Sequence, residues 1–283
     1  MEIAEKLRTR RIAIIGNPNV GKSSIFNQLT GLNQKIGNYP GMTVDKMVGY
    51  FHKGEQHFEL IDLPGTYSLL PKSEDEVIAH KVLNGQGEEK PDAALVILDA
   101  CNLERSLLLG TQVMDLGIPI AFVINMKDLA EKRGLNIKTF ALYQELGVPL
   151  VMTDARNNHG LDAVKELFIE NKFVIGKPFH ELEFPELLSE VQEKFGYEQP
   201  YQAFQQLIFA SFDPTLSEEK RLWLEERSKA FDFDPIDQQT KETTGRYKKI
   251  KDLLSKSVLS GSNEPREFHG KLDAIFLHPV LLP

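Results

Sequence analysis

Short apolar segments alternate with amphipathic segments from the N-terminus to about residue 170. The apolar segments have the length of buried strands, whereas the amphipathic ones repeat apolar residues with a helical period. We expect strands near 11–15, 45–52, 56–61, 93–98, 119–124 and 148–152, and helices near 22–30, 75–84, 103–115, 138–146 and 160–170. This alternation is typical of an α/β fold in which helices cover a sheet.

The second and third strands are joined only by Lys53-Gly54-Glu55. A parallel crossover needs about a dozen residues, so these two strands should form an antiparallel hairpin. We therefore predict a mixed six-stranded sheet with one antiparallel pair at its edge.

The strand pattern stops beyond Phe173. Segments with helical periodicity follow, separated by breaks rich in Pro, Gly and Asp, at 186–194, 201–210, 218–230, 240–256 and 267–277. The sequence thus predicts a first α/β domain over 1–170 and a smaller all-helical domain over 171–283, with the boundary near 171–177.

Composition changes this picture little: the chain has 283 residues, of which 41% are hydrophobic and 26% charged, which is ordinary for a globular protein. The longest apolar runs, such as 93–98 and 118–124, are far shorter than the roughly 20 residues of a transmembrane helix. The charged N-terminus lacks the apolar stretch of a secretory signal. The single cysteine, Cys101, excludes an internal disulfide and suits a reducing compartment. A net charge of −8 argues against a broad nucleic-acid footprint.

The strongest chemical motif is the stretch Gly16-Asn17-Pro18-Asn19-Val20-Gly21-Lys22-Ser23, which fits G-x-x-x-x-G-K-[ST] between a strand and a helix. The glycines let backbone N–H groups approach phosphate oxygens at a helix N-terminus. Lys22 would neutralise the β and γ phosphates, and Ser23 would place its hydroxyl on Mg²⁺. We expect this loop, with the adjacent Ser24, to bind a nucleoside triphosphate.

A D-x-x-G box, Asp62-Leu63-Pro64-Gly65, follows the predicted strand 56–61. Its carboxylate would bind Mg²⁺ through water, and the Gly65 N–H would sense the γ-phosphate. Between the two motifs, Thr43 is our candidate for a switch threonine that closes on Mg²⁺ and the γ-phosphate; Thr30 lies inside a helix and is a poorer candidate. The neighbouring residues expected at the nucleotide are Gly41, Met42, Val44 and Asp45.

The stretch Asn125-Met126-Lys127-Asp128 follows an apolar strand and matches an N-x-x-D guanine box. One carboxylate, that of Asp128, can accept both the N1–H and the 2-amino hydrogens of guanine, whereas adenine offers no such donor pair. Thr153-Asp154-Ala155-Arg156 occupies the place of a last base-contacting loop, in which the Ala155 N–H would bond guanine O6. The predicted ligand is therefore GTP or GDP.

With these motifs assembled, the chain resembles the small-GTPase-like G domains, and more narrowly the cytosolic N-terminal part of ferrous iron transport protein B (FeoB). The resemblance spans nearly the whole chain. It rests on 16–23, on Gly37-Asn38-Tyr39-Pro40-Gly41-Met42-Thr43-Val44, on 62–69, on Asn125-Met126 with Asp128, on Gly245-Arg246-Tyr247 with Ile250, and on 271–281.

The resemblance implies a Ras-like P-loop GTPase domain that regulates a bacterial Fe²⁺ transporter from the cytoplasmic face of the inner membrane. It also implies that the chain is a fragment, whose partners are the membrane permease domain of the full-length chain and small accessory iron-transport proteins. Two positions depart from common patterns. Met126 stands where many guanine boxes have Lys, and Asp154 stands where the family usually has Ser. A carboxylate at position 154 would lie near Asp128, and like-charge repulsion would then speed nucleotide release.

Thr66 follows the D-x-x-G box and is too short to orient water as the glutamine of Ras-like enzymes does. No arginine is an obvious finger, so intrinsic hydrolysis should be slow. Asn19 resembles a P-loop asparagine through which some GTPases hold K⁺ beside the phosphates, although Asn also shapes turns. The expected catalytic residues are Lys22, Thr43, Asn19 and Gly65, with Mg²⁺ and K⁺ as cofactors.

The remaining charged residues and histidines are more typical of an ordinary polar surface than of a further site. The acidic runs 74–76 and 88–89 could form iron sites, but they are more typical of a solvated helix start and a loop. The basic stretch Arg246, Lys248, Lys249, Lys251 and Lys256 indicates either a polar helix face or a surface toward anionic lipid. No metal-ligand spacing is evident among the seven histidines, His52, His57, His80, His159, His180, His269 and His278.

Two other functional classes stay open from the sequence. One is a soluble ribosome- or tRNA-associated GTPase, which the acidic balance and the His278-Pro279-Val280 ending disfavour. The other is an interaction module that binds GTP without meaningful turnover.

Overall fold

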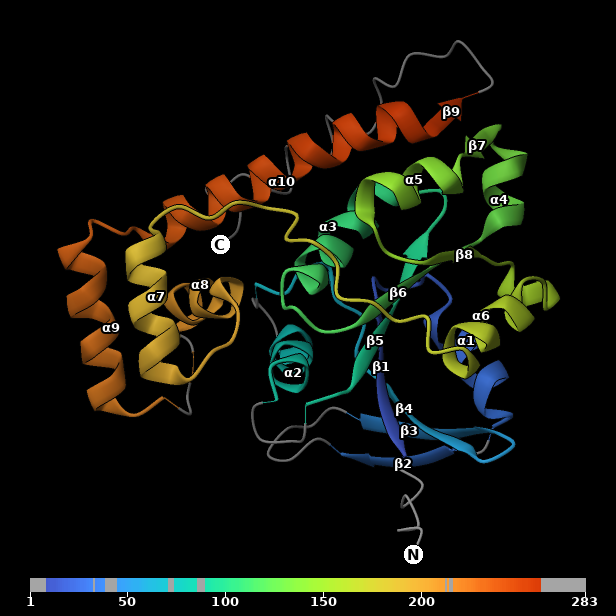
Figure 1. Ribbon diagram of the computed structural model, residues 1–283, viewed down its shortest axis with the longest axis horizontal. Helices are drawn as coiled ribbons and strands as arrows, with labels where there is room; N and C mark the ends of the chain where they lie inside the picture. Colours follow the sequence, from blue (N-terminus) through green and yellow to red (C-terminus); the bar gives the residue numbers. More distant parts are fainter. Residues whose placement is uncertain are drawn as a thin grey trace, which may run out of the picture.

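The structure is a computed structural model that describes residues 9–32, 34–38, 45–70, 74–85, 90–211, 213 and 216–260. Its centre is a seven-stranded sheet in the order β2-β3-β4-β1-β5-β6-β8 (Figure 1). The strands are β1 (Arg10–Gly16), β2 (Gln34–Asn38), β3 (Asp45–Lys53), β4 (Gln56–Asp62), β5 (Ala93–Asp99), β6 (Ile120–Asn125) and β8 (Leu150–Met152).

Helices cover both faces of this sheet (Figure 1). They are α1 (Lys22–Thr30), α2 (Glu74–Leu83), α3 (Leu103–Met114), α4 (Lys127–Lys132), α5 (Thr139–Leu146) and α6 (Leu161–Ile169). Alternate residues of β1 enter opposite cores: Ile12 and Ile14 pack with α1 and α6, whereas Ala13 and Ile15 pack with α2 and α3. Both faces of the central strand are thus buried, which explains its unbroken apolar sequence.

The predicted α/β class and the hairpin are confirmed: β3 and β4 pair antiparallel, with Lys53 opposite Gln56. The predicted count of six strands is wrong, because β2 pairs antiparallel with β3 and forms the true edge. The sheet therefore has two antiparallel pairs. This edge strand escaped prediction because its one large apolar side chain, Ile36, is 69% exposed and gives no burial pattern.

The helical part comprises α7 (Pro185–Phe195), α8 (Pro200–Phe209), α9 (Glu218–Ala230) and α10 (Pro235–Ser257), so four of the five predicted helices lie where expected. The fifth, 267–277, lies outside the described residues. Helix α10 runs back over the first part of the chain and packs against α3 and α5 (Figure 1). Its end continues into β9 (Val258–Ser260), which pairs with β7 (Leu135–Ile137). The boundary at 171–177 stays a prediction.

A buried histidine lies where α2 meets α8. The His80 side chain is 2% exposed and its ring contacts Phe209 at 5.6 Å between centroids. Burial lowers the pKa of His80 to about 4; the charge of Lys81 lowers it further, while Asp213 and a hydrogen bond to the Leu69 backbone oppose the shift. The native protein therefore keeps this imidazole neutral.

We predict that acidification destabilises the protein through His80. Below pH 6.5, the ordinary pKa, His80 binds a proton in the unfolded chain, whereas in the native state it does so only near pH 4. The free energy of unfolding therefore falls by up to about 1.4 kcal/mol per pH unit between these two pH values as the pH is lowered. Between pH 7 and pH 5, His80→Gln should lose about 2 kcal/mol less than the wild type in urea unfolding. The exposed His159→Gln serves as the control, and equal losses in all three proteins would contradict the prediction.

Candidate functional site

The phosphate-loop motif lies between the end of β1 and the start of α1, as predicted. Asn19 and Gly21 have left-handed backbone conformations, with φ of 64° and 83°. A Cβ atom at Gly16 would collide with the Ile97 carbonyl oxygen, and one at Gly21 with the Asn125 side chain. The motif's two glycines are therefore required by close approach, and the loop is held against the guanine box.

Lys22 and Asp62 meet in the site. The Lys22 ammonium contacts the Asp62 carboxylate, and their side chains are only 11% and 5% exposed. Burial raises the pKa of Asp62, an effect that the Lys22 charge opposes. The two residues predicted to contact the phosphates and Mg²⁺ thus form a largely buried ion pair. Binding of a nucleotide would have to break this pair.

The D-x-x-G box lies against the phosphate loop. Leu63 is buried and its N–H donates to the Ile14 carbonyl at 2.9 Å. A Cβ on Gly65 would come within 3.1 Å of the Pro18 backbone. Thr66 is 1% exposed and its hydroxyl donates to the Ser68 carbonyl at 2.8 Å. Because that hydroxyl is buried within its own turn, Thr66 cannot orient an attacking water in this conformation.

Asn125 joins three parts of the site. Its side-chain N–H donates to the Val20 carbonyl of the phosphate loop at 2.9 Å. Its Oδ1 accepts from the Thr153 hydroxyl and from the Ala155 N–H, each at 3.0 Å. The Ala155 N–H that we assign to guanine O6 therefore already has a partner, and the base would have to share or displace it.

The remaining guanine-box residues lie at the start of α4. Met126 has a left-handed φ of 66° and caps the helix, and the Lys127 N–H donates to the Thr153 carbonyl at 3.1 Å. The Asp128 side chain is 28% exposed and lies 3.7 Å from the Lys132 ammonium. The carboxylate proposed to read the base is accessible, since its ion pair is at the protein surface.

Asp154 has a structural role that sequence reasoning did not identify. Its carboxylate accepts from the Asn157 side chain at 2.6 Å and from the Asn157 backbone N–H at 3.3 Å, capping a short 3₁₀ turn, η1 (Ala155–Asn157). These hydrogen bonds lower the pKa of Asp154. The carboxylate thus stabilises the conformation of the 153–156 loop, and the fast nucleotide release expected from repulsion with Asp128 stays a prediction.

The residues expected to contact the nucleotide or its ions differ in exposure. Asn19, Ser23, Ser24, Asp45 and Arg156 are all exposed in this structure. Pro64 and Gly65 are half-buried, and Asn17 is buried. The predicted contacts Gly41, Met42, Thr43 and Val44 lie outside the described residues.

Three glutamines near the site carried no sequence signal. The Gln28 amide donates to the Ala155 carbonyl at 2.5 Å, so helix α1 also contacts the 153–156 loop. Gln112 accepts from the Leu69 N–H at 2.8 Å, and Gln205 donates to the Leu69 carbonyl at 3.1 Å. The segment after the D-x-x-G box is therefore hydrogen-bonded both to α3 and to α8 of the helical part.

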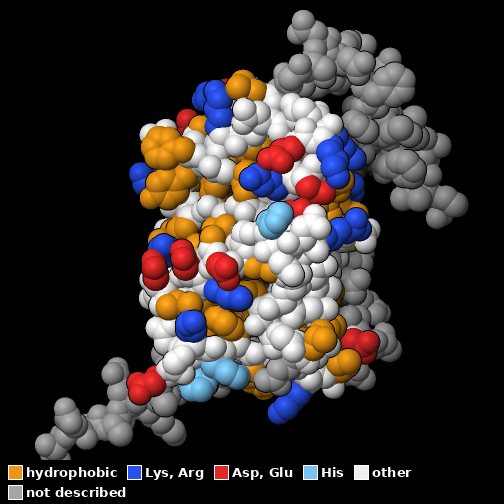
Figure 2. Space-filling view, turned by 90° about the vertical axis from the view of Figure 1, so that its right-hand side faces the viewer, with side chains coloured by type: hydrophobic (Ala, Val, Ile, Leu, Met, Phe, Trp, Pro, Cys, Tyr) orange, Lys and Arg blue, Asp and Glu red, His pale blue; other side chains and the backbone are white. Residues whose placement is uncertain are grey.

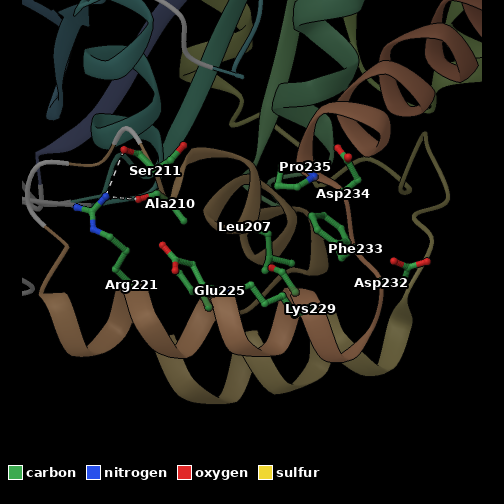
Figure 3. Close-up of a pocket in the computed structure, with 12 residues that line it drawn as sticks. Leu207, Ala210, Ser211, Arg221, Glu225, Lys229, Asp232, Phe233, Asp234 and Pro235 are labelled. Carbon is green, nitrogen blue, oxygen red and sulfur yellow. Dashed lines mark hydrogen bonds between the residues drawn. The ribbon is translucent and has the colours of Figure 1, made fainter.

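One hollow in the described part of the chain lies away from these residues. It has a volume of about 430 Å³ and lies between α8, α9 and the start of α10 (Figure 3). Leu207 and Phe233 form part of its apolar floor, and Arg221 reaches across one end to donate to the Ala210 and Ser211 carbonyls. Because it contains no motif residue, we do not assign it to the nucleotide.

The chain matches known proteins over both of its parts. The sequence model of the family described as Ferrous iron transport protein B matches residues 10–168. A Leptospira biflexa "Fe(2+) transporter FeoB" is 32% identical over 97% of this chain and 41% of its own length. A Porphyromonas gingivalis "Fe(2+) transport protein A/Fe(2+) transporter FeoB fusion protein" is 43% identical over 56% of this chain and 19% of its own length. The chain thus spans less than half the length of these relatives.

Solved structures agree with this match. The cytosolic domain of L. pneumophila FeoB is 31% identical, with a TM-score of 0.74 over 88% of this chain and 100% of that one. The cytosolic domain of T. maritima FeoB in its GMPPNP form is 27% identical, with a TM-score of 0.68 over 89% of this chain and 100% of that one. Since the family match covers more than half of the sequence, the chain belongs to the ferrous iron transport protein B family, as a GTP-binding G domain followed by helices.

Proposed function

We propose that this chain binds GTP with Mg²⁺, hydrolyses it slowly with help from K⁺, and thereby regulates a bacterial Fe²⁺ transporter. The observation that carries the proposal is the convergence of the motifs. The phosphate loop, Asp62, the guanine box and the 153–156 loop follow β1, β4, β6 and β8, which run parallel within one sheet. Carboxyl ends of parallel strands share one edge, where α/β proteins bind ligands.

The donor chemistry fits the expected ions. Mg²⁺ prefers hard oxygen ligands, which the exposed Ser23 hydroxyl and the Asp62 carboxylate supply. When bound, Mg²⁺ would neutralise the charge that develops on the phosphates. Lys22 would leave Asp62 for the phosphates, and the Gly65 N–H would donate to the γ-phosphate. Thr43 is the proposed switch residue of the same site.

The catalytic help proposed from K⁺ rests on Asn19. Its side chain is exposed at the phosphate loop and offers a carbonyl oxygen, which suits a hard monovalent cation. Its left-handed backbone shows that it also shapes the loop, so both roles considered for this residue are compatible. A cation there would stabilise charge that an arginine finger stabilises in other GTPases.

We predict faster multiple-turnover phosphate release from GTP in KCl than in NaCl, by about tenfold, because only K⁺ is expected to fit beside the phosphates. ATP should give little release in either salt, since Asp128 cannot pair with adenine. Asn19→Ala should remove the salt difference while retaining fluorescent GDP binding. Equal rates in both salts would contradict the K⁺ role. If GTP were hydrolysed in neither salt, the chain would instead be an interaction module that binds GTP without turnover.

The transporter role rests on the relatives, of which this chain spans only part. We propose that the domain acts at the cytoplasmic face of the bacterial inner membrane, on a permease region of the full-length protein, with small accessory iron-transport proteins as partners. None of the described helices is long and apolar enough to cross a bilayer.

Fe²⁺ uptake by vesicles holding the full-length protein should depend on GTP. An rRNA filter-binding assay should be negative; saturable RNA binding would favour the ribosome-associated alternative.

The contacts of the Leu69 segment support a regulatory role. Gln205, which donates to the Leu69 carbonyl, accepts from the Asn84 amide at 3.2 Å, and Asn84 accepts from Gln202 at 2.9 Å. Both glutamines belong to α8. A movement of the segment after the D-x-x-G box would therefore displace the contacts of α8. Through these contacts a change of bound nucleotide would alter the position of the helical part.

A further inference from the structure

The turn between β3 and β4 brings together two histidines that sequence spacing had not connected. His52 lies directly opposite His57 across the hairpin, and their ring centroids are 5.8 Å apart. Both side chains are exposed, in contrast to the buried His80. Figure 2 shows two neighbouring histidine side chains at the lower end of the face that includes this turn.

The turn geometry explains why these side chains are close. Gly54 and Glu55 form a two-residue loop, and Gly54 has a φ of 57°, as the first central residue of a type II′ turn requires. Lys53 and Gln56 are register partners beside this loop, and the pair that flanks a two-residue hairpin loop is a hydrogen-bonded pair. The next pair outward is then a non-hydrogen-bonded pair, in which cross-strand side chains approach most closely.

The opposite face of the same hairpin is fixed by packing. Phe51 and Phe58 stack at 5.5 Å between centroids, and both meet Phe168 of α6 edge to face. The backbone positions beneath the two histidines are therefore set before any ligand arrives, which limits the ordering cost of binding.

We propose that His52 and His57 form a two-histidine site for a divalent first-row transition-metal ion. Imidazole nitrogen is a ligand suited to Cu²⁺, Ni²⁺ and Zn²⁺, with Cu²⁺ binding most tightly in the usual order. Among the described residues no group of three or more His, Cys, Asp or Glu side chains could hold a metal ion. The neighbouring Glu59 carboxylate is occupied by Arg11 at 2.7 Å. Water completes the coordination shell of this site.

The site is separate from the proposed Mg²⁺ site and independent of GTP hydrolysis. It joins β3 and β4 near the turn, whereas Asp45 and Asp62 lie at the other ends of these strands. A metal ion bound to both histidines clamps the two strands in their present register, so binding raises the thermal unfolding midpoint.

The test uses the whole chain without an affinity tag, in excess Mg²⁺, titrated with Zn²⁺ by calorimetry and with Cu²⁺ by electron paramagnetic resonance. We expect one equivalent of metal per chain and a Cu²⁺ spectrum with two nitrogen couplings. His52→Gln and His57→Gln should each weaken binding about tenfold or more and remove one nitrogen coupling. They should also remove the metal-induced rise in unfolding midpoint.

Two controls separate this site from other histidines. His159→Gln changes an exposed histidine elsewhere, and the double variant His269→Gln/His278→Gln changes two outside the described residues; both should bind as the wild type does. Circular dichroism checks that every variant is folded. Wild-type affinity in His52→Gln, or loss of binding in the double tail variant, would overturn the proposal, whatever the outcome of the GTP assays.

Discussion

Lys22→Met is expected to reduce GTP turnover by about 100-fold or more, the size of effect seen when one charge-stabilising group is removed from an active site. Methionine keeps the apolar stem but cannot neutralise the β and γ phosphates. Phosphate release at saturating GTP and Mg²⁺ measures the effect. Lys165→Met, on the surface of α6, is the matched control and should behave as the wild type. Turnover within about twofold of wild type in Lys22→Met would contradict the assigned role.

The same substitution should also change the protein without nucleotide. Lys22 is the charge that opposes the burial-induced rise in the pKa of Asp62. Without it the carboxylate binds its proton more tightly, so Mg²⁺ binding should require a higher pH. Asp62→Asn in the Lys22→Met background removes the unpaired buried carboxylate, and urea unfolding should show the double variant to be more stable than Lys22→Met alone.

The sequence predicts elements well where burial imposes a pattern. Strands β1, β5 and β6 are apolar because helices cover them, and each was placed within a few residues of its observed bounds. The edge strand β2 and the short helix α4 were missed, since neither buries a regular set of side chains. The pairing of β7 with β9 joins residues more than a hundred positions apart through three residues each, which no local pattern records.

The candidate site divides in the same way. Motif residues such as Lys22, Asp62 and Asn125 could be proposed from the sequence because phosphate and guanine chemistry demand particular residue types at fixed spacings. Gln28 was not found, because it acts on Ala155 through a contact that depends only on the tertiary fold. His52 and His57 are five residues apart in the sequence, a separation that does not indicate a metal site. They become neighbours only because the hairpin places one opposite the other.

Arg246 is the residue for which sequence reasoning failed most clearly. It was grouped with the lysines that follow it as part of a polar or lipid-facing surface, yet its side chain is 0% exposed, whereas Lys248 and Lys249 are exposed. Its guanidinium lies 2.8 Å from the Asp115 carboxylate at the end of α3 and donates to Glu242 at 2.8 Å. For Arg246 both surface interpretations are wrong.

This arginine joins the helical part to the first part of the chain. Asp115 also accepts from the Phe179 N–H at 2.6 Å in the segment before α7, and the Tyr201 hydroxyl of α8 donates to Glu242 at 3.1 Å. The Arg246 guanidinium lies 5.3 Å from the Tyr201 ring centroid. Burial raises the pKa of Asp115, and the Arg246 charge opposes that rise. Two buried carboxylates thus depend on one cation.

Arg246→Met should therefore lower the free energy of unfolding by about 3–5 kcal/mol, because it leaves both carboxylates buried without their counter-charge. The loss should grow as pH rises, since burial raises the pKa of Asp115 and that carboxyl group can escape the penalty only by binding a proton. Urea unfolding at two pH values measures both effects. Lys241→Met removes an exposed cation on the same helix and should cost no more than about 1 kcal/mol.

A triple variant with Asp115→Asn and Glu242→Gln added to Arg246→Met decides between lost charge pairing and lost packing. Removing the orphaned charges should recover part of the stability and abolish the added pH dependence, whereas a purely steric role for the arginine would leave both unchanged. Because Arg246 touches none of the nucleotide motifs, fluorescent GDP binding should persist in every variant that remains folded. Loss of GDP binding with the fold intact would instead mean that α10 supports the nucleotide site directly.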